Sequence, residues 1–320
     1  MILVTGAAGF IGSCLVSGLN EAGNSDLILV DEFKTFSKEA NLEGKSFVQK
    51  VDREEFLENL DSYSDRLKFI FHLGARTDTT ELNKEIFDRL NVAYSKALWT
   101  FAAINKIPFI YASSAATYGG GDHGYDDKSA IDPLTPLNPY GQSKQSFDLW
   151  ARQEQQAPPA WAGLKFFNVY GPNEYHKGRM ASVIFHAFNQ IKSTGKLKLF
   201  RSHREDFEDG QQSRDFVYVK DVVKACLFFL QDSFPSGLFN IGTGKARPCY
   251  DLGLATFSAM GVDPNIEFID TPEDIRETYQ YFTEAKMEKL ASAGYSESWM
   301  DLEEGVRDYV TQYLIPGKYY

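Results

Sequence analysis

The 320-residue sequence predicts a doubly wound α/β fold, in which a parallel β-sheet is covered by helices on both faces. Three observations favour this class. The chain begins with a strand–glycine turn–helix–strand pattern that ends in an acid. Further short apolar runs alternate with amphipathic stretches, as in parallel sheets buried on both faces. The pattern then changes near residue 168, which predicts a smaller lobe on the C-terminal side.

The first thirty-one residues form the most informative unit of the sequence. An apolar run at 2–5 leads into a helical pattern of Leu15, Val16 and Leu19, and a second apolar run at 27–30 ends at Asp31. The turn between strand and helix carries Gly6, Gly9 and Gly12. Such glycines permit a tight turn, let the backbone approach a pyrophosphate and allow close helix packing, while the acid accepts hydrogen bonds from a ribose. This unit predicts a dinucleotide-binding Rossmann domain.

The remaining strands place polar or small residues where each one ends. The expected strands are 46–52, 68–73, 109–112 and 163–167, with an amphipathic stretch at 93–104. Gly74, Ser114 and Asn168 follow three of these strands. Ligands of open α/β sheets bind at the carboxyl ends of the strands, so all three residues are candidate site positions. Asp52 ends the first of these strands, where it is either an adenine contact or a plain surface acid.

The predicted division of the chain is discontinuous. A helix at 221–230 and a strand at 238–242 resemble elements that return to the main sheet. We therefore expect a dinucleotide-binding domain of residues 1–167 plus about 216–243. A substrate lobe then comprises about 168–215 plus 244–320.

Composition limits the function. The net charge of −11 argues against nucleic acid or an anionic membrane as a general partner. Three widely spaced cysteines fit no metal or disulfide pattern, so we expect no metal and a reducing compartment. The first strand begins at Met1 and no apolar run is long enough to span a membrane, which predicts a cytoplasmic protein.

A second stretch, 138–144, carries candidate catalytic groups. Asn138 and Pro139 suit a helix start, which places Tyr140 and Lys144 on one helix face, four residues apart. A nearby ammonium and an oxidised nicotinamide are expected to lower the pKa of the phenol toward neutrality. Tyr140 then takes a proton from a substrate hydroxyl that Ser114 holds, while Lys144 contacts the nicotinamide ribose.

Three segments, 111–120, 175–183 and 214–219, together resemble the ADP-L-glycero-D-manno-heptose 6-epimerase family of the extended short-chain dehydrogenase/reductase superfamily. The resemblance covers nearly the whole chain, and its His176-Lys177-Gly178 segment is the most specific part. It implies inversion at C6 of ADP-D-glycero-D-manno-heptose through a transient 6-keto intermediate, with tightly bound NADP, in the synthesis of the lipopolysaccharide inner core. Tyr140 and Lys177 are the implied acid/base pair.

The resemblance also implies binding roles. The expected cofactor contacts are Gly6, Gly9, Phe10, Ile11, Gly12, Asp31, Glu32, Lys38, Arg53, Leu73, Gly74, Ala75, Asn91, Tyr140, Lys144, Val169 and Lys177. The expected substrate contacts are Ser114, Asn168, Arg179, His186, Phe200, Arg214 and Tyr279. A homo-oligomer, a pentamer in the family, is implied as well.

The choice of cofactor depends on charges near the second strand. Asp31 and Glu32 disfavour a 2′-phosphate and therefore favour NAD. Lys34, Lys38 and Arg53 can neutralise that phosphate, and we expect NADP, with NAD as the alternative.

Other functions remain to be separated from this one. Arg179 stands where the family has a small serine, and the segment 201–212 looks longer than the family's loop, so both bear on substrate identity. Ala115 and Ala116 replace the Asp-Glu pair of 4,6-dehydratases, which argues against dehydration. The rivals are a UDP-hexose 4-epimerase, a reductase and a non-catalytic cofactor-binding regulator.

Overall fold

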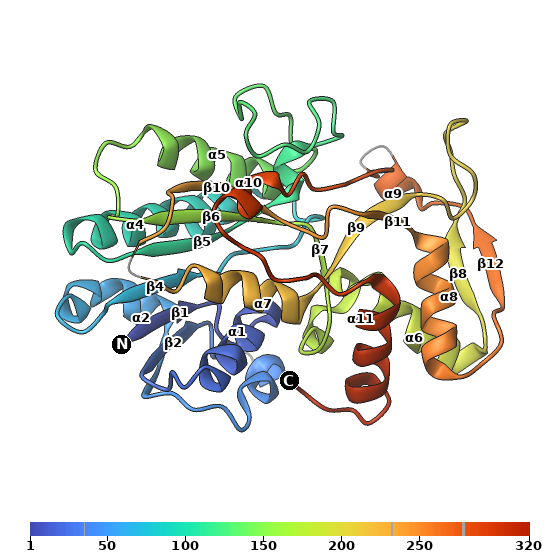
Figure 1. Cartoon of the computed structure of the whole chain (residues 1–320), viewed down its shortest axis with the longest axis horizontal. Coiled ribbons are helices and arrows are strands. Elements are labelled where there is room, and N and C mark those ends of the chain that lie inside the picture. Colours follow the sequence, from blue (N-terminus) through green and yellow to red (C-terminus); the bar gives the residue numbers. More distant parts are fainter. Residues whose placement is uncertain (35, 232, 277–278) are drawn as a thin grey trace.

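The computed structural model describes residues 1–34, 36–231, 233–276 and 279–320. Its centre is a seven-stranded sheet in which every neighbouring pair of strands is parallel. The order is β10 (Gly237–Ile241), β6 (Trp161–Phe166), β5 (Phe109–Ser114), β4 (Phe69–His72), β1 (Ile2–Thr5), β2 (Leu27–Asp31) and β3 (Gln49–Asp52). The sheet with its helices occupies the left part of Figure 1. The predicted fold class is confirmed.

Helices bury both faces of the sheet, and the strands show why. Successive residues of one strand belong to different cores. Leu3 and Ile70 pack in one apolar cluster, whereas Val4 and Phe71, the residues that follow them, pack in the other. The flanking helices are α1 (Phe10–Glu21), α2 (Arg53–Glu58), α3 (Lys84–Phe87), α4 (Tyr94–Ile104), α5 (Pro139–Gln153) and α7 (Val219–Phe228). Such two-sided burial explains the continuous apolar runs of these strands.

The glycine turn between β1 and α1 requires its glycines. Gly6 has φ +67°, and a Cβ on it would lie 2.7 Å from Gly74 Cα in the turn after β4. A Cβ on Gly12 would lie 2.0 Å from the Gly6 carbonyl oxygen. Only glycine allows this close packing of the helix start on two strand ends. Two strand starts differ from prediction: pairing with β2 begins at Gln49 rather than near residue 46, and β6 begins at Trp161 rather than at 163.

The second part of the chain builds smaller sheets at the right of Figure 1. One has the order β11 (Ala246–Pro248), β9 (Ser213–Tyr218) and β7 (Asn168–Tyr170), and β8 (Leu197–Phe200) pairs with β12 (Ile266–Ile269). The helices beside these smaller sheets are α6 (Val183–Thr194), α8 (Cys249–Met260), α9 (Glu273–Arg276) and α11 (Leu302–Tyr309), whereas α10 (Glu288–Ser292) lies beside β10 of the main sheet. The strand expected at 238–242 corresponds to β10, which lies in the main sheet as predicted. The proposed division into two lobes, with its boundaries, stays a prediction.

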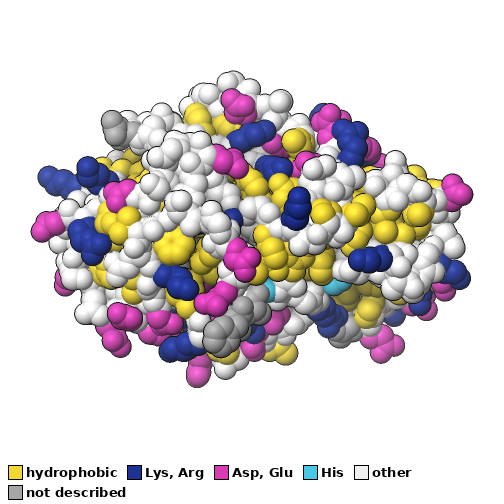
Figure 2. Space-filling model, turned by 90° about the horizontal axis from the view of Figure 1, so that it is seen from below, with side chains coloured by type: hydrophobic (Ala, Val, Ile, Leu, Met, Phe, Trp, Pro, Cys, Tyr) yellow, Lys and Arg dark blue, Asp and Glu magenta, His cyan; other side chains and the backbone are white. Residues whose placement is uncertain are grey.

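The surface carries mixed charge. Acidic and basic side chains are interspersed over the face that Figure 2 shows. Cys14, Cys226 and Cys249 are buried free thiols, as expected. In the described part of the chain no helix is long and apolar enough to cross a membrane, and no group of acidic, histidine or cysteine side chains has the arrangement of a metal site.

Candidate active site

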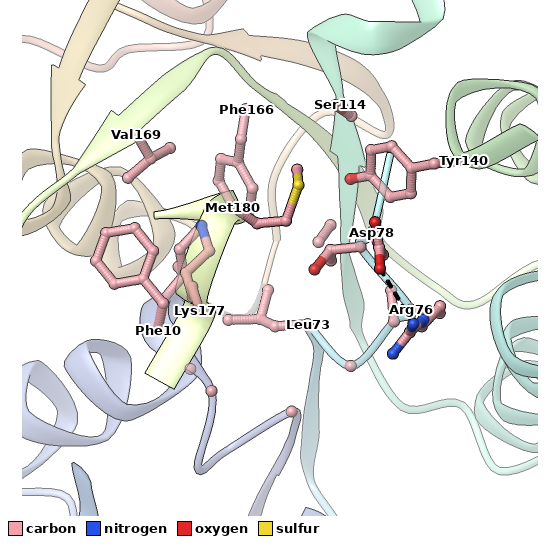
Figure 3. Close-up of a pocket in the computed structure, with 18 of the residues that line it drawn as sticks. Phe10, Leu73, Arg76, Asp78, Ser114, Tyr140, Phe166, Val169, Lys177 and Met180 are labelled. Carbon is pink, nitrogen blue, oxygen red and sulfur yellow. Dashed lines mark hydrogen bonds and ion pairs between the residues drawn. The ribbon is translucent and has the colours of Figure 1, made fainter. Parts of the chain in front are cut away.

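A cavity of about 670 Å³ opens at the carboxyl ends of the main-sheet strands. Its walls are the glycine turn, the segment after β4, the end of β5, the start of α5 and the turn η5 (Tyr175–Met180). Figure 3 shows side chains from these elements converging on one space. This is the edge at which ligands of open α/β sheets bind.

Most of the predicted site residues meet in this cavity. Those that line it are Gly6, Gly9, Phe10, Ile11, Gly12, Asp31, Lys38, Arg53, Leu73, Gly74, Ala75, Ser114, Tyr140, Lys144, Asn168, Val169 and Lys177. Those that do not are Glu32, Asn91, Arg179, His186, Phe200, Arg214 and Tyr279.

The start of α5 places Tyr140 and Lys144 as predicted. Asn138 caps the helix, accepting a hydrogen bond from Gly141 N at 2.8 Å, and Pro139 occupies its first turn. Lys144 is 6% exposed, and its Nζ donates to Ala112 O at 2.7 Å. Burial lowers the pKa of Lys144 to about 8, against the opposing effect of Asp148.

The surroundings of Tyr140 set the pKa of its phenol in the protein without a cofactor. Burial raises the pKa of its phenol, a hydrogen bond with Ser114 opposes this, and the charge of Asp148 adds to it. The Lys144 ammonium is directed to the Ala112 carbonyl, and the lowered phenol pKa expected with a bound, oxidised nicotinamide stays a prediction. The net shift favours the protonated phenol, which forms a hydrogen bond with the Ser114 side chain.

Lys177 approaches the cavity from the opposite side. Its Nζ lies 5.0 Å from the centre of the Phe10 ring, and Figure 3 shows Lys177 and Tyr140 on opposite sides of the space, with Met180 between them. Burial lowers the pKa of Lys177, while the carboxylate of Glu174 opposes the shift. The cavity thus has a titratable group on each of two walls, which suits proton transfer on two faces of one substrate.

The far end of the cavity holds the predicted cofactor charges. Asp31 Oδ2 accepts from Ala8 N at 2.9 Å, and Oδ1 accepts from Glu32 N at 2.7 Å and Lys38 Nζ at 3.0 Å. Arg53 also lines this end. Its Nε forms no hydrogen bond within the described chain, although Glu54 lies 3.5 Å away as an ion-pair partner. Glycine turn and cations together fit the phosphates of a dinucleotide.

Two predicted contacts have other partners. Asn91 Oδ1 accepts from Arg76 N at 2.8 Å, and Nδ2 donates to Arg76 O and Ser143 Oγ, both at 2.9 Å. Asn91 therefore holds the segment after β4 from behind rather than facing the cavity. His186 Nε2 lies 3.3 Å from Arg179 O, so these two residues sit together outside the cavity wall.

Three predicted substrate residues form a group of their own. The Arg214 guanidinium lies 5.2 Å from the Tyr279 ring centre, and the Phe200 ring is 6.0 Å from that of Tyr279. The adjacent segment 201–212 is held by His203, whose backbone N donates to Tyr281 OH at 3.0 Å. Thr271 N donates to His203 Nε2 at 3.2 Å. The group lies in the smaller part of the molecule.

Some lining residues were not anticipated. Arg76 and Asp78 face the cavity from the segment after β4 and form an ion pair at 3.2 Å, which Figure 3 shows. Met180 and His176 line it from η5. The sequence could have indicated Arg76 and Asp78, because they follow Gly74 at the carboxyl end of β4. No sequence signal indicated that His176 and Met180 line the cavity, because their place depends on how η5 folds over the sheet.

The model of the NAD dependent epimerase/dehydratase family matches residues 2–242. An ADP-L-glycero-D-manno-heptose-6-epimerase of Fusobacterium nucleatum subsp. nucleatum is 47% identical over 325 residues, and one of Nitratidesulfovibrio vulgaris (strain DP4) is 48% identical over 318 residues. Each alignment covers 98% of both chains.

Solved structures agree with these matches. The Helicobacter pylori ADP-L-glycero-D-manno-heptose-6-epimerase has a TM-score of 0.81 at 27% identity, covering 97% of this chain and 95% of that one. The Thermus thermophilus UDP-glucose 4-epimerase in complex with NAD has a TM-score of 0.78 at 25% identity, covering 97% of each chain.

Proposed function

This chain belongs to the NAD-dependent epimerase/dehydratase family, and within it to the ADP-L-glycero-D-manno-heptose-6-epimerases, and we propose that it inverts C6 of the heptose in ADP-D-glycero-D-manno-heptose. The product is ADP-L-glycero-D-manno-heptose, and the reaction is an isomerisation. One observation carries the proposal: Tyr140 and Lys177 face one cavity from opposite walls. A simple dehydrogenase needs one such group, whereas epimerisation presents the oxygen in two orientations.

The roles of the residues follow from their places. When bound, the nicotinamide cofactor accepts and returns the hydride. Tyr140 exchanges a proton with the C6 oxygen in one orientation while Ser114 donates a hydrogen bond to it. Lys177 exchanges the proton in the other orientation, and its lowered pKa favours that role because the neutral amine is accessible nearer pH 7. Lys144 adds positive charge beneath Tyr140.

We infer NADP as the cofactor. Both carboxylate oxygens of Asp31 already accept backbone hydrogen bonds, and Lys38 neutralises the charge that would repel a 2′-phosphate. Arg53 supplies a second cation at the same end. Glu32 does not line the cavity, so of the two acids that favour NAD only Asp31 faces it.

The substrate nucleotide is assigned to the smaller lobe. Arg214 is largely buried against the Tyr279 ring, which Phe200 in turn contacts, so its guanidinium suits a pyrophosphate and the rings suit a base or sugar. Asn168, at the start of β7, lines the cavity and pairs with Phe216 of β9, the strand that carries Arg214. We further propose a cytoplasmic homo-oligomer, a pentamer of the 36.1 kDa chain, which sedimentation velocity measures directly.

The deciding experiment uses the purified protein with ADP-D-glycero-D-manno-heptose and no added cofactor. We expect the L-glycero epimer to accumulate to a fixed ratio, measured by chromatography. Net consumption of added NADPH would indicate a reductase, and turnover of UDP-glucose instead would indicate a UDP-hexose 4-epimerase. If the protein binds cofactor but turns over no nucleotide sugar, the result would indicate a non-catalytic, cofactor-binding regulator.

A further inference from the structure

Asn173 stands out in the segment that leads to Lys177. It is fully buried and has φ +73°, and Lys106 is the other non-glycine residue with positive φ in the described part of the chain. Asparagine enters this conformation more readily than most residues, but the conformation still persists only where neighbouring contacts hold it.

The contacts that hold Asn173 come from a distant part of the sequence. Its Nδ2 donates to Tyr320 O at 2.9 Å and to Ser13 Oγ at 3.0 Å, and its Oδ1 accepts from Tyr320 N at 2.9 Å. Tyr175 OH donates to Lys318 O at 2.7 Å. One amide side chain therefore satisfies both backbone groups of Tyr320, and the segment 318–320 is fixed across the start of η5. We call Asn173 with residues 318–320 the clamp.

The clamp is coupled to Lys177 through a short turn. Lys177 N donates to Glu174 O at 3.0 Å, and the buried Glu174 carboxylate accepts from Ser182 N and Ser182 Oγ, each at 2.6 Å. The turn is thus closed at its far end by Ser182 and at its near end by Asn173. Because so few residues separate these ends, the direction of Lys177 depends on the backbone at Asn173.

The clamp also connects Lys177 to the glycine turn. Asn41 Nδ2 donates both to Asn173 O at 3.1 Å and to Ala8 O at 2.9 Å. Asn173 itself does not line the cavity. It can therefore affect chemistry only through the residues that it holds.

We propose that Asn173, together with residues 318–320, is a positioning device that sets the direction of Lys177 toward the substrate. The proposal rests on the proposed function, since it takes Lys177 as one of the two acid/base groups. Asn173 is a positioning residue, because it touches neither cavity nor substrate.

The first test is Asn173→Gly, which keeps the positive φ and removes the side-chain hydrogen bonds. We expect kcat to fall about 10- to 100-fold, as a small displacement of a reacting group does, with NADP affinity unchanged. Lys106→Gly is the matched control, since it is exposed, has the same backbone conformation and lies away from the cavity. Wild-type kcat in Asn173→Gly overturns the proposal.

The second test asks whether the effect passes through Lys177. In a Lys177→Met background, Asn173→Gly is expected to cause no further loss of the residual rate. Removal of residues 318–320 should match the loss in Asn173→Gly, and the combined variant should lose no more than either one. An additional 10-fold loss in the Lys177→Met background means that Asn173 acts elsewhere, which overturns the proposal.

A third readout does not depend on activity. Cys14 is fully buried in α1, and its Sγ donates to Pro172 O, next to the clamp, at 3.5 Å. Alkylation by iodoacetamide, mapped by mass spectrometry, should quicken at Cys14 in both clamp variants, while Cys226 and Cys249 serve as internal controls. Unchanged Cys14 labelling overturns the clamp itself. If Lys177→Met keeps full activity, Lys177 has no role as an acid/base group. That outcome contradicts the proposed function and is distinct from a failure of the clamp.

Discussion

Tyr140 and Lys177 show how the same physical effect acts oppositely on two side chains. Burial disfavours the charged form of any group, so it raises the pKa of the Tyr140 phenol and lowers that of the Lys177 ammonium. Both groups are consequently poised toward their neutral forms. For the phenol this makes the positive charge of a bound cofactor and of Lys144 more important, because they must offset the cost of forming the phenolate.

We predict that Tyr140→Phe and Lys177→Met each lose most epimerisation, about 100-fold or more, because each removes one general acid/base group. Cofactor stays bound, since neither substitution alters the glycine turn. The measurement is the initial rate of epimer formation, beside the cofactor content of the purified protein. A wild-type rate in either variant would remove that residue from the mechanism.

Lys38 allows a test of cofactor choice at the same scale. We predict that Lys38→Ala weakens NADP binding about 10- to 100-fold and NAD binding much less, because a charge-assisted hydrogen bond to a phosphate contributes about 1.5–3 kcal/mol. Titration of the cofactor-free protein with each nucleotide measures this. Lys196→Ala, at an exposed lysine that does not line the cavity, is the control. Equal weakening of both cofactors would mean that the 2′-phosphate is bound elsewhere.

At the scale of elements, a buried ion pair connects α5 to the sheet. Lys165 on β6 and Asp148 on α5 are each 1% exposed at the side chain, with Nζ and Oδ2 2.7 Å apart. Lys165 also donates to Thr117 Oγ1 at 2.7 Å, while Tyr111 OH and Ser113 Oγ donate to the Asp148 carboxylate. The ion pair fixes α5, which carries Tyr140, against β6, and the Tyr111 and Ser113 hydroxyls fix it against β5, which ends at Ser114.

We predict that Lys165→Met lowers the free energy of unfolding by about 3–5 kcal/mol, because it leaves Asp148 as an uncompensated buried charge. Urea unfolding measures this. Lys50→Met is the matched control, since its ion pair with Glu39 is exposed and should contribute less than about 1 kcal/mol. A loss in Lys165→Met no larger than in the control would contradict the structural role of the pair.

At the scale of the whole molecule, His72 couples the core beneath the site to pH. It is buried, with Nδ1 2.7 Å from Thr5 Oγ1 and Nε2 2.9 Å from Ser95 Oγ. Burial, aided by the charge of Lys144, lowers its pKa to about 3, from an unfolded value near 6.5. Between these values the unfolded chain binds more protons than the native protein. The contribution of neutral His72 to the free energy of unfolding is therefore fully present above pH 6.5 and is lost as the pH falls toward 3.

We predict that at pH 5 the wild-type protein has lost about 2 kcal/mol of stability on account of His72, which is the free-energy equivalent of about 1.5 pKa units. His72→Gln keeps polar partners for Thr5 and Ser95 but cannot be protonated, so its stability should fall less between pH 7.5 and pH 5. His123→Gln, at an exposed histidine, is the control. Identical pH dependence in wild type and His72→Gln would contradict the prediction.

The sequence alone was sufficient for features built from neighbouring residues. The glycine turn, the Asp31 position, the Asn138 cap and the Tyr140–Lys144 spacing are local, and each was where its pattern indicated. Apolar runs were enough for the parallel sheet, since burial on both faces leaves a continuous signal. Two strand starts were misplaced, near 46 rather than at Gln49 and at 163 rather than at Trp161, because pairing rather than composition decides where a strand begins.

Only the tertiary structure decided which distant groups meet. Lys38 neutralises Asp31, Lys165 reaches Asp148, and Asn173 clamps Tyr320, because strand order and the folding of η5 bring these pairs together. The same long-range packing separates Arg214 and Tyr279 from the cavity and directs Lys144 to a carbonyl rather than to the phenol. Such partners are chosen by register and burial, which are properties of the folded chain and leave no mark in local sequence.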